Sequence, residues 1–239
     1  MRKDHRPYPL KKAYLKFEKF YAEHFLRPHF DAFGKGHRFM RPWNVEVFGA
    51  PITLGNFATV VASPDKRVRF SIWSERDECD GIRIGNYCLI CPGVRISAAA
   101  GVRIGDSCMM ANGVYITDSD WHDLYDRAAT GKAVPVRIEN NVWLGDSCVV
   151  CKGVHIGENS IVGAGAVVIN SIPPNTVAAG NPARVVKQLD PDRPLRTRAH
   201  WYADPHTLNR QFQDWDRAVM AGNSLWGWLR YLLMPKKGD

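Results

Sequence analysis

A histidine surrounded by carboxylates is the group in this 239-residue chain best suited to acid–base chemistry. His122 lies in the segment TDSDWHDLYDR. An imidazole titrates near neutral pH, so it can take a proton from a reacting group and later return it. A histidine in that role needs an acceptor for its second ring nitrogen. Asp118, Asp120 and Asp123 are local candidates for this acceptor. A backbone carbonyl is an equal alternative, and the spacing does not choose between them.

The segment that carries His122 interrupts a six-residue repeat. Residues 138–173 divide into IENNVW, LGDSCV, VCKGVH, IGENSI, VGAGAV and VINSIP, with an aliphatic first letter and a mostly small fifth letter. A helix repeats near 3.6 residues and a half-buried strand at 2, so neither fits. A period of six is typical of a parallel β-helix, in which each coil stacks on the one before. The repeat also occupies 84–95 and 104–121, and it is broken from 122 to 137. Such insertions are often on the binding face, which places His122 on a functional loop.

Six cysteines offer a second kind of chemistry. Two C-x2-C pairs, Cys88 with Cys91 and Cys148 with Cys151, have a spacing that zinc sites also use. The repeat gives another explanation, because Cys88, Cys108 and Cys148 all occupy the small fifth position. Reduced cysteine packs as a small apolar residue. We therefore expect structural thiols and no metal site.

The two ends differ from the repeats. Residues 8–33 have apolar residues at spacings of three and four and predict an amphipathic helix that stops at Pro28. The expected domains are a basic amphipathic helical arm (1–43), the β-helix (44–189) with its catalytic loop (117–137), and a linker with a Trp-rich helical extension (190–239). The basic excess is in the arm, where residues 1–43 hold 11 Lys and Arg against 4 Asp and Glu.

The chain has no apolar leader and no apolar stretch of about 18 residues, so we expect a cytoplasmic protein. The basic, aromatic ends suggest peripheral contact with the inner face of the membrane. The alternative is that both terminal helices pack on an oligomer and bury their aromatic faces. No nucleic-acid-binding motif accompanies the basic arm, and we expect no nucleic acid partner.

The repeats together resemble a known family. The blocks of aliphatic-Gly-x-x-small-x, the broken coil with a histidine, and the run NNVWLG…GAGAVV…IPPNTVAAGNPARVV are similar to the hexapeptide-repeat acyltransferases. The similarity is greatest to the maltose/galactoside O-acetyltransferase-like and polysaccharide O-acetyltransferase branch, and it covers about 82–189. It implies a left-handed parallel β-helix, with α-helical extensions at both ends in this chain. It also implies a homotrimer with sites between subunits and acetyl-CoA as co-substrate, with no permanently bound cofactor.

The resemblance also assigns roles to residues. It implies that His122 is the general base, with Asp120 and Asp123 as its nearest candidate orienting groups. It places acetyl-CoA beside Trp143 and the small residues of the following coils, with cations for its phosphates. The donor-site residues implied in this sequence are Trp143, Gly145, Asp146, Ala164, Gly165, Arg184 and Lys187.

Two positions depart from the family pattern at the donor site. Asp146 stands where a small hydroxyl residue is common, and Ile169-Asn170 replaces a common Thr-Lys pair. The lost lysine removes a phosphate contact, and Asp146 repels a polyanionic donor. Another acyl donor is therefore an open alternative. On the acceptor side, the residues expected to hydrogen-bond sugar hydroxyls are Asn112, Asp118, Tyr125 and Arg127.

The sequence thus predicts an acyltransferase that moves an acetyl group to a hydroxyl of a sugar, in a surface glycan or glycolipid precursor. Transfer to a sugar amine and a non-enzymatic solenoid used for assembly are the alternatives. A zinc enzyme on the same scaffold needs three histidine ligands. Only His122 and His155 occur between residues 82 and 189, which disfavours it.

Overall fold

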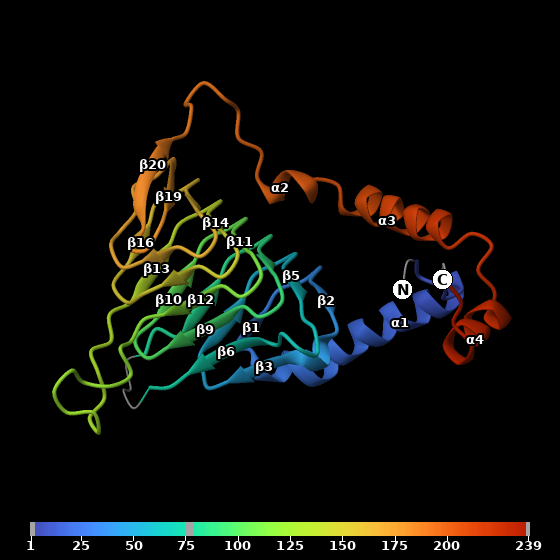
Figure 1. Cartoon of the computed structure of the whole chain (residues 1–239), viewed down its shortest axis with the longest axis horizontal. Helices are drawn as coiled ribbons and strands as arrows, with labels where there is room; N and C mark the ends of the chain where they lie inside the picture. Colours follow the sequence, from blue (N-terminus) through green and yellow to red (C-terminus); the bar gives the residue numbers. More distant parts are fainter. Residues whose placement is uncertain (1–2, 75–78, 238–239) are drawn as a thin grey trace.

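Three sheets wrap the core, and the chain visits them in the same order on successive turns (Figure 1). The computed structural model describes residues 3–74 and 79–237. The strands of sheet A are β1 (Ala32–Phe33), β4 (Ile52–Leu54), β7 (Ile82–Ile84), β10 (Val102–Ile104), β13 (Val136–Ile138) and β16 (His155–Ile156). Those of sheet B are β2 (Arg38–Met40), β5 (Thr59–Val61), β8 (Leu89–Ile90), β11 (Met109–Met110), β14 (Trp143–Leu144), β17 (Ile161–Val162), β19 (Thr176–Ala179) and β20 (Arg184–Gln188). Those of sheet C are β3 (Val45–Phe48), β6 (Val68–Ile72), β9 (Arg95–Ala98), β12 (Tyr115–Thr117), β15 (Val149–Val150) and β18 (Val167–Val168).

This arrangement is a three-sided parallel β-helix. Neighbouring strands of each sheet pair in parallel, except that β20 returns antiparallel to β19 and ends sheet B. Inward residues stack in columns, as where Ile84, Ile104 and Ile138 lie in register and are buried. The aliphatic first positions predicted from the repeat are confirmed as core residues: Ile138, Leu144, Val150, Ile156, Val162 and Val168. Cys88, Cys108 and Cys148 are buried free thiols in the same core.

The first coil begins earlier than residue 44. Strands β1 and β2 lie inside the segment that we expected to be the helical arm. Phe33-Gly34 occupies the place of Leu54-Gly55 in the next coil, and a Cβ on Gly34 would come within 2.3 Å of the Gly55 carbonyl group. The fifth position of this block is His37 instead of a small residue. That exchange hides the block from a search for the repeat.

The predicted N-terminal helix is present, but its buried side differs from the expected one. Helix α1 (Tyr8–Tyr21) continues as a π-helical turn (Ala22–Leu26) and a 3-10 turn (Arg27–His29). Glu18, Ala22 and Leu26 are the residues that it buries. Glu18 tolerates burial because its carboxylate accepts the Arg41 N–H at 2.7 Å. Tyr14, Phe17 and Tyr21, which belong to the apolar pattern that predicts the helix, instead pack around Trp43.

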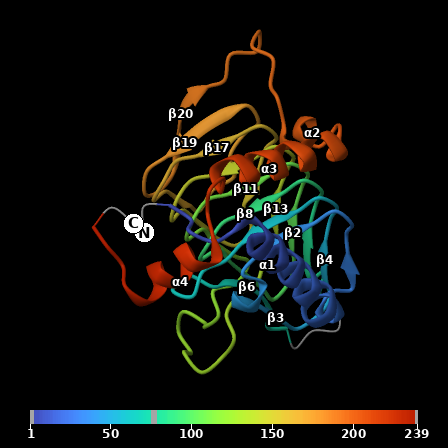
Figure 2. The same ribbon diagram turned by 90° about the vertical axis from the view of Figure 1, so that its right-hand side faces the viewer.

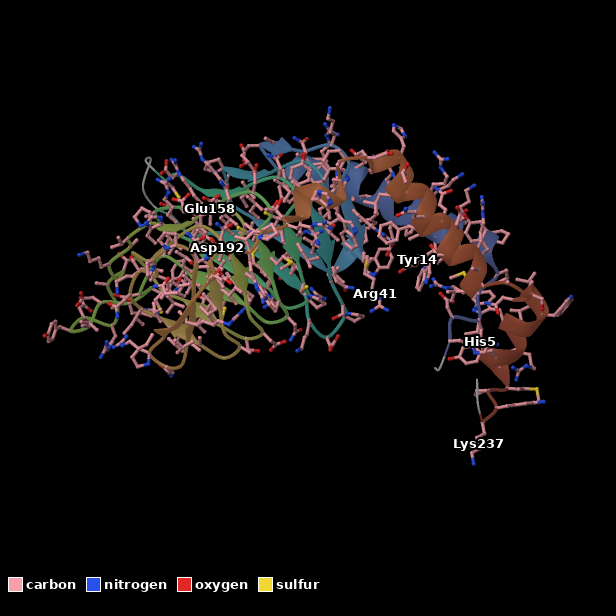
Figure 3. The ribbon with its side chains drawn as sticks, turned by 90° about the horizontal axis from the view of Figure 1, so that it is seen from above. His5, Tyr14, Arg41, Glu158, Asp192 and Lys237 are labelled. Atoms are coloured by element: carbon pink, nitrogen blue, oxygen red, sulfur yellow. The ribbon has the colours of Figure 1, made fainter. Side chains whose placement is uncertain are left out.

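The C-terminal extension returns along the molecule to the N-terminus (Figures 1 and 2). It consists of α2 (Arg198–Trp201), α3 (Pro205–Val219) and α4 (Leu225–Leu233). Arg198 Nε donates to the Tyr87 carbonyl at 2.7 Å and fixes α2 to the coils. At the far end, the His5 and Tyr231 rings stack at 4.2 Å, and Figure 3 shows His5 and Lys237 at this end. The two termini therefore form one helical layer beside the β-helix. Within the described residues, no helix has the length and apolar character needed to cross a bilayer.

Candidate active site

The loop that carries His122 is a hairpin-like excursion, here called the tongue (residues 118–134), between β12 and β13. Its base is closed by the Val134 N–H, which donates to the Asp118 carbonyl at 2.8 Å, and by an antiparallel bridge between Ser119 and Ala133. Figure 1 shows this excursion projecting from the coils on the side away from α1 and α3. The predicted break in the repeat thus corresponds to a closed element with a defined base.

Asp118 anchors the tongue to the coil before it. Its side chain is completely buried, and its carboxylate accepts the backbone N–H groups of Ala99, Ala100 and Gly101. Burial raises the pKa of Asp118, and these three hydrogen bonds oppose that rise. Both oxygens are occupied, so Asp118 has a structural role. This geometry corrects the expectation that it contacts sugar hydroxyls.

The His122 ring is oriented by a backbone carbonyl. Its Nδ1 lies 2.9 Å from the Arg127 carbonyl oxygen, across the tip of the tongue, and the side chain is exposed. A carbonyl can only accept, so Nδ1 carries a proton, and in the neutral imidazole the lone pair is on Nε2. The Arg127 guanidinium in turn donates to the Asp123 carbonyl at 3.0 Å. In the neutral imidazole, Nε2 is thus the nitrogen of His122 that can accept a proton.

The two carboxylates expected to orient His122 have other partners. Asp120 pairs with Lys152 on a neighbouring coil. Asp123 accepts the backbone N–H groups of Tyr125 and Asp126, and these bonds lower its pKa. Asp120 and Asp123 thus shape the tongue, and the alternative of a backbone carbonyl is the one found.

The expected acceptor residues are divided between two parts of the molecule. Tyr125 and Arg127 lie on the tongue with His122, and Tyr125 is 96% exposed. Asn112 lies instead at the corner between sheets B and C, where its Nδ2 donates to Asp146 Oδ2 at 3.0 Å. Asn112 is therefore next to an expected donor residue and belongs to another corner of the β-helix.

An outward row on sheet B contains two of the expected donor residues, Trp143 and Lys187. Trp143 pairs in register with Ile161, then Val177, then Lys187, so all four side chains lie on one face. Met109 precedes Trp143 in the same row. The row is apolar along most of its length and ends in a cation.

The small residues and charges near this row play distinct parts. Gly145 is buried, and a Cβ there would lie 2.6 Å from the Ala164 nitrogen, so it serves coil packing. Ala164 and Gly165 are exposed, and a Cβ on Gly165 would meet no atom within 4 Å. Arg184 is exposed on β20. Hydrogen bonds from Ser147 and Asn112 lower the pKa of Asp146, which keeps it ionised at neutral pH.

A cleft that the sequence did not indicate lies beside the tongue. Its volume is about 540 Å³, and Trp121 and Gly131 of the tongue form one wall. Phe48 and Trp73 form the opposite wall, with ring centroids 4.5 Å apart, and both are more than half exposed. The signal that could have located it is positional, because β3, β6 and β9 end at the corner where β12 leads into the tongue.

The coils match known family models. The model described as bacterial transferase hexapeptide (six repeats) matches residues 135–170, and the hexapeptide repeat of succinyl-transferase matches 81–118. Galactoside O-acetyltransferase of Escherichia coli is 40% identical over 109 residues, which are 46% of this chain and 45% of that protein. A putative acetyltransferase of Staphylococcus aureus is 42% identical over 66 residues, 28% of this chain and 33% of the relative. The chain thus spans less than half the length of these curated relatives.

A solved structure extends the similarity to most of the chain. An N-acyltransferase from Bacillus cereus, in complex with dTDP-4-amino-4,6-dideoxyglucose and coenzyme A, superposes with a TM-score of 0.57. It is 18% identical, and the match covers 80% of this chain and 95% of the other. The fold is therefore shared, and the family models identify residues 81–118 and 135–170 as hexapeptide repeats of the kind that transferases contain.

Proposed function

We propose that this protein is an O-acetyltransferase that moves the acetyl group of acetyl-CoA to a hydroxyl of a sugar, in a surface glycan or glycolipid precursor. The observation that supports the proposal is the orientation of the His122 ring. Its Nδ1 contacts the Arg127 carbonyl, and both residues lie on the tongue, which projects from the hexapeptide coils. A fixed imidazole with a free Nε2 is suited to activate an alcohol, which is a poor nucleophile until it loses its proton. The named relatives that transfer acetyl groups support the reaction class.

In the proposed reaction, Nε2 of His122 takes the hydroxyl proton as the acceptor oxygen attacks the thioester carbonyl carbon. The tetrahedral intermediate then collapses, and the carbon–sulfur bond breaks. The leaving thiolate receives the proton from His122, which yields free CoA thiol and the acetyl ester. This sequence needs no covalent acyl-enzyme.

The outward row on sheet B supports a donor site. Trp143, Ile161 and Val177 offer an apolar track along which an extended pantetheine arm can lie. Lys187 ends the row, and Arg184 is on the same strand, so we place the CoA phosphates at this end. Asp146 is ionised on the corner beside the row, which disfavours phosphates there.

We place the acceptor sugar in the cleft between the tongue and the Phe48–Trp73 pair. Aromatic faces bind the apolar faces of sugar rings, and the cleft reaches the residue next to His122. Tyr125 and Arg127 stay on the tongue as candidate hydroxyl contacts.

We further propose that the coils wind left-handed, as the family implies, and that the working unit is a homotrimer. Trp143 lies on the outer face of sheet B, whereas His122 lies on the tongue that follows sheet C. Within one chain, the base and the donor row are thus on different sides of the β-helix. A neighbouring subunit that brings its tongue to this row completes the site.

The test combines donor binding with transfer. Calorimetry with acetyl-CoA should give one saturable site per chain, and thiol release should then be followed with a panel of sugars and amino sugars. His122→Ala should bind acetyl-CoA normally but turn over at least about 10²-fold more slowly. His155→Ala is the matched control, because this exposed histidine pairs with Glu139 on sheet A.

Each alternative has its own outcome. Faster transfer to an amino sugar than to its hydroxyl analogue would make the enzyme an N-acetyltransferase. Binding of a longer acyl-CoA but not of acetyl-CoA would support another donor. A chain that binds no acyl-CoA would contradict the enzymatic proposal and favour an assembly role.

A further inference from the structure

A second and larger cleft lies far from the tongue. It has a volume of about 950 Å³ and is bounded by α1 on one side and by α2 and α3 on the other. Strands β2 and β5 of sheet B form its floor. Figure 1 shows α1 and α3 at the end of the molecule opposite to the tongue, and Figure 2 again shows α3 above α1. This α1–α3 cleft is therefore separate from the candidate active site.

One wall of the cleft is cationic. Lys12, Lys16 and Lys19 follow one another at spacings of four and three, so they lie on one face of α1, and all three line the cleft. Lys35 lines it from the first coil. In the part of the chain that the structure describes, none of these four lysines forms an ion pair.

The acidic side chains do not neutralise this wall. Seven cationic and three acidic residues line the cleft. Glu23 pairs with Arg27 at 2.8 Å, and Glu18 is buried against the Arg41 N–H. Asp216 is the remaining acid, across the cleft on α3. The excess positive charge favours an anionic ligand.

The facing surface is apolar and aromatic. Leu15, Val61 and Leu89 line the cleft from α1 and sheet B, and Trp201 and Phe212 line it from α2 and α3. The Arg38 guanidinium carbon lies 5.1 Å from the centre of the Phe212 ring, which joins the floor to α3. A ligand that fills this space therefore has an apolar body as well as an anionic group.

A buried imidazole also lines the wall of the cleft. The His37 side chain is 5% exposed and lines the cleft. Its Nδ1 contacts the Gly34 carbonyl at 3.0 Å, whereas its Nε2 has no hydrogen-bond partner and lies 3.4 Å from Glu23. Nε2 is buried and faces the Glu23 carboxylate, so His37 adds a polar group to the wall beside the lysines.

We propose that the α1–α3 cleft binds a lipid phosphate, that is, a phosphate ester of a long apolar chain. The phosphate lies against Lys12, Lys16 and Lys19, and the chain lies along Leu89, Trp201 and Phe212. Ammonium groups are suited to a phosphate, and the apolar wall provides the burial that a hydrocarbon chain needs. This inference concerns a site away from His122, and it does not depend on acetyl transfer.

The experiment measures binding to the full chain by calorimetry and by tryptophan fluorescence. The probe is farnesyl phosphate below its critical micelle concentration, compared with farnesol, which lacks the phosphate, and inorganic phosphate, which lacks the chain. Farnesyl phosphate should bind saturably at one site per chain, at least about tenfold more tightly than either comparison ligand.

Two triple variants locate the site. Lys12→Gln/Lys16→Gln/Lys19→Gln should weaken farnesyl phosphate binding by about tenfold or more. Lys3→Gln/Lys11→Gln/Lys66→Gln removes the same charge from positions outside the cleft and should bind normally. Five of the six lysines are exposed and Lys11 is half-buried beside Asp4, so circular dichroism checks that each variant folds. Equal affinity for farnesol and farnesyl phosphate, or equal loss in both triple variants, would overturn the proposal.

Discussion

Single residues set how closely the coils stack at the corner after sheet B. Gly145 is buried there, and an added Cβ would lie 2.6 Å from both the Val162 carbonyl oxygen and the Ala164 nitrogen. Both are backbone atoms, so neither can rotate away. The sequence resemblance implied that Gly145 serves the CoA arm. The contact instead gives it a role in the β-helix itself.

Gly145→Ala should therefore destabilise the fold even without any ligand. We expect a loss of roughly 1–3 kcal/mol in the free energy of unfolding, as for other overpacked sites. The measurement is urea unfolding. Gly163→Ala is the control, because its Cβ would come no closer than 3.1 Å to the Ala179 Cβ and 3.5 Å to the Ala178 carbonyl oxygen. Equal stability of the two variants would contradict the packing argument.

At the scale of the element, the tongue determines what His122 can do. The Asp123 carboxylate caps the N–H groups of Tyr125 and Asp126, which turns the chain so that the Arg127 carbonyl faces His122. Asp118 and Asp120 fix the base of the same element to neighbouring coils. The three carboxylates near His122 in the sequence thus bind backbone N–H groups or a lysine, and the His122 ring contacts a backbone carbonyl instead.

Asp123→Ala should loosen this turn and lower kcat/KM for acetyl transfer by roughly tenfold to a hundredfold. Asp123→Asn should restore most of the activity, because an asparagine side-chain oxygen accepts the same two N–H groups. Steady-state kinetics of both variants decide the point. If Asn fails as badly as Ala, the negative charge of Asp123 is what His122 needs, and the turn argument is wrong.

At the scale of the whole molecule, the separation of His122 from the sheet B row makes the site a property of the assembly. A mixture of His122→Ala and Trp143→Ala chains, refolded together at equal amounts, should recover activity although each variant alone is impaired. Random trimers regain both wild-type contributions at about one quarter of their sites. Transfer rates measured before and after mixing test this. If mixing the two variants restores no activity, His122 and Trp143 of one active site come from the same chain.

The exposed face of α4 tests the expectation of membrane contact. Leu225, Trp226, Leu232 and Leu233 are exposed and recur at a spacing of seven, so they share one face, and Trp226 and Leu233 are each 80% exposed. Lys237 follows on the same end of the chain (Figure 3). Aromatic and cationic groups together favour an anionic lipid surface.

We expect the intact protein to co-sediment with vesicles that contain phosphatidylglycerol but not with pure phosphatidylcholine vesicles. Trp226→Ser/Leu233→Ser should lower the bound fraction at least about tenfold. Leu124→Ser/Tyr125→Ser on the tongue is the matched control for lost exposed apolar surface. If the intact protein binds neither kind of vesicle and the α4 variant no longer forms the oligomer, the exposed face of α4 packs between subunits.

The six-residue period was enough to predict the coils, the inward aliphatic columns and the buried cysteines, because those depend on local spacing that every coil repeats. It also located His122 on an excursion from the coils. The first coil was missed because His37 occupies a position that is elsewhere small. The buried face of α1 was also not predicted. Glu18 lies on it because its carboxylate accepts the N–H of Arg41, which is 23 residues later in the chain.

Only the tertiary structure shows which side chains from distant parts of the chain contact one another. Three carboxylates lie close to His122 in the sequence, but each has another partner. Asp118 is buried, Asp120 pairs with Lys152, and Asp123 accepts backbone N–H groups in a turn. The Phe48–Trp73 wall lies beside the tongue because coils bring the ends of successive strands to one corner. The α1–α3 cleft requires the C-terminal helices to return to the N-terminus. A sequence period fixes what repeats along the chain, whereas contacts between its ends depend on the path in space.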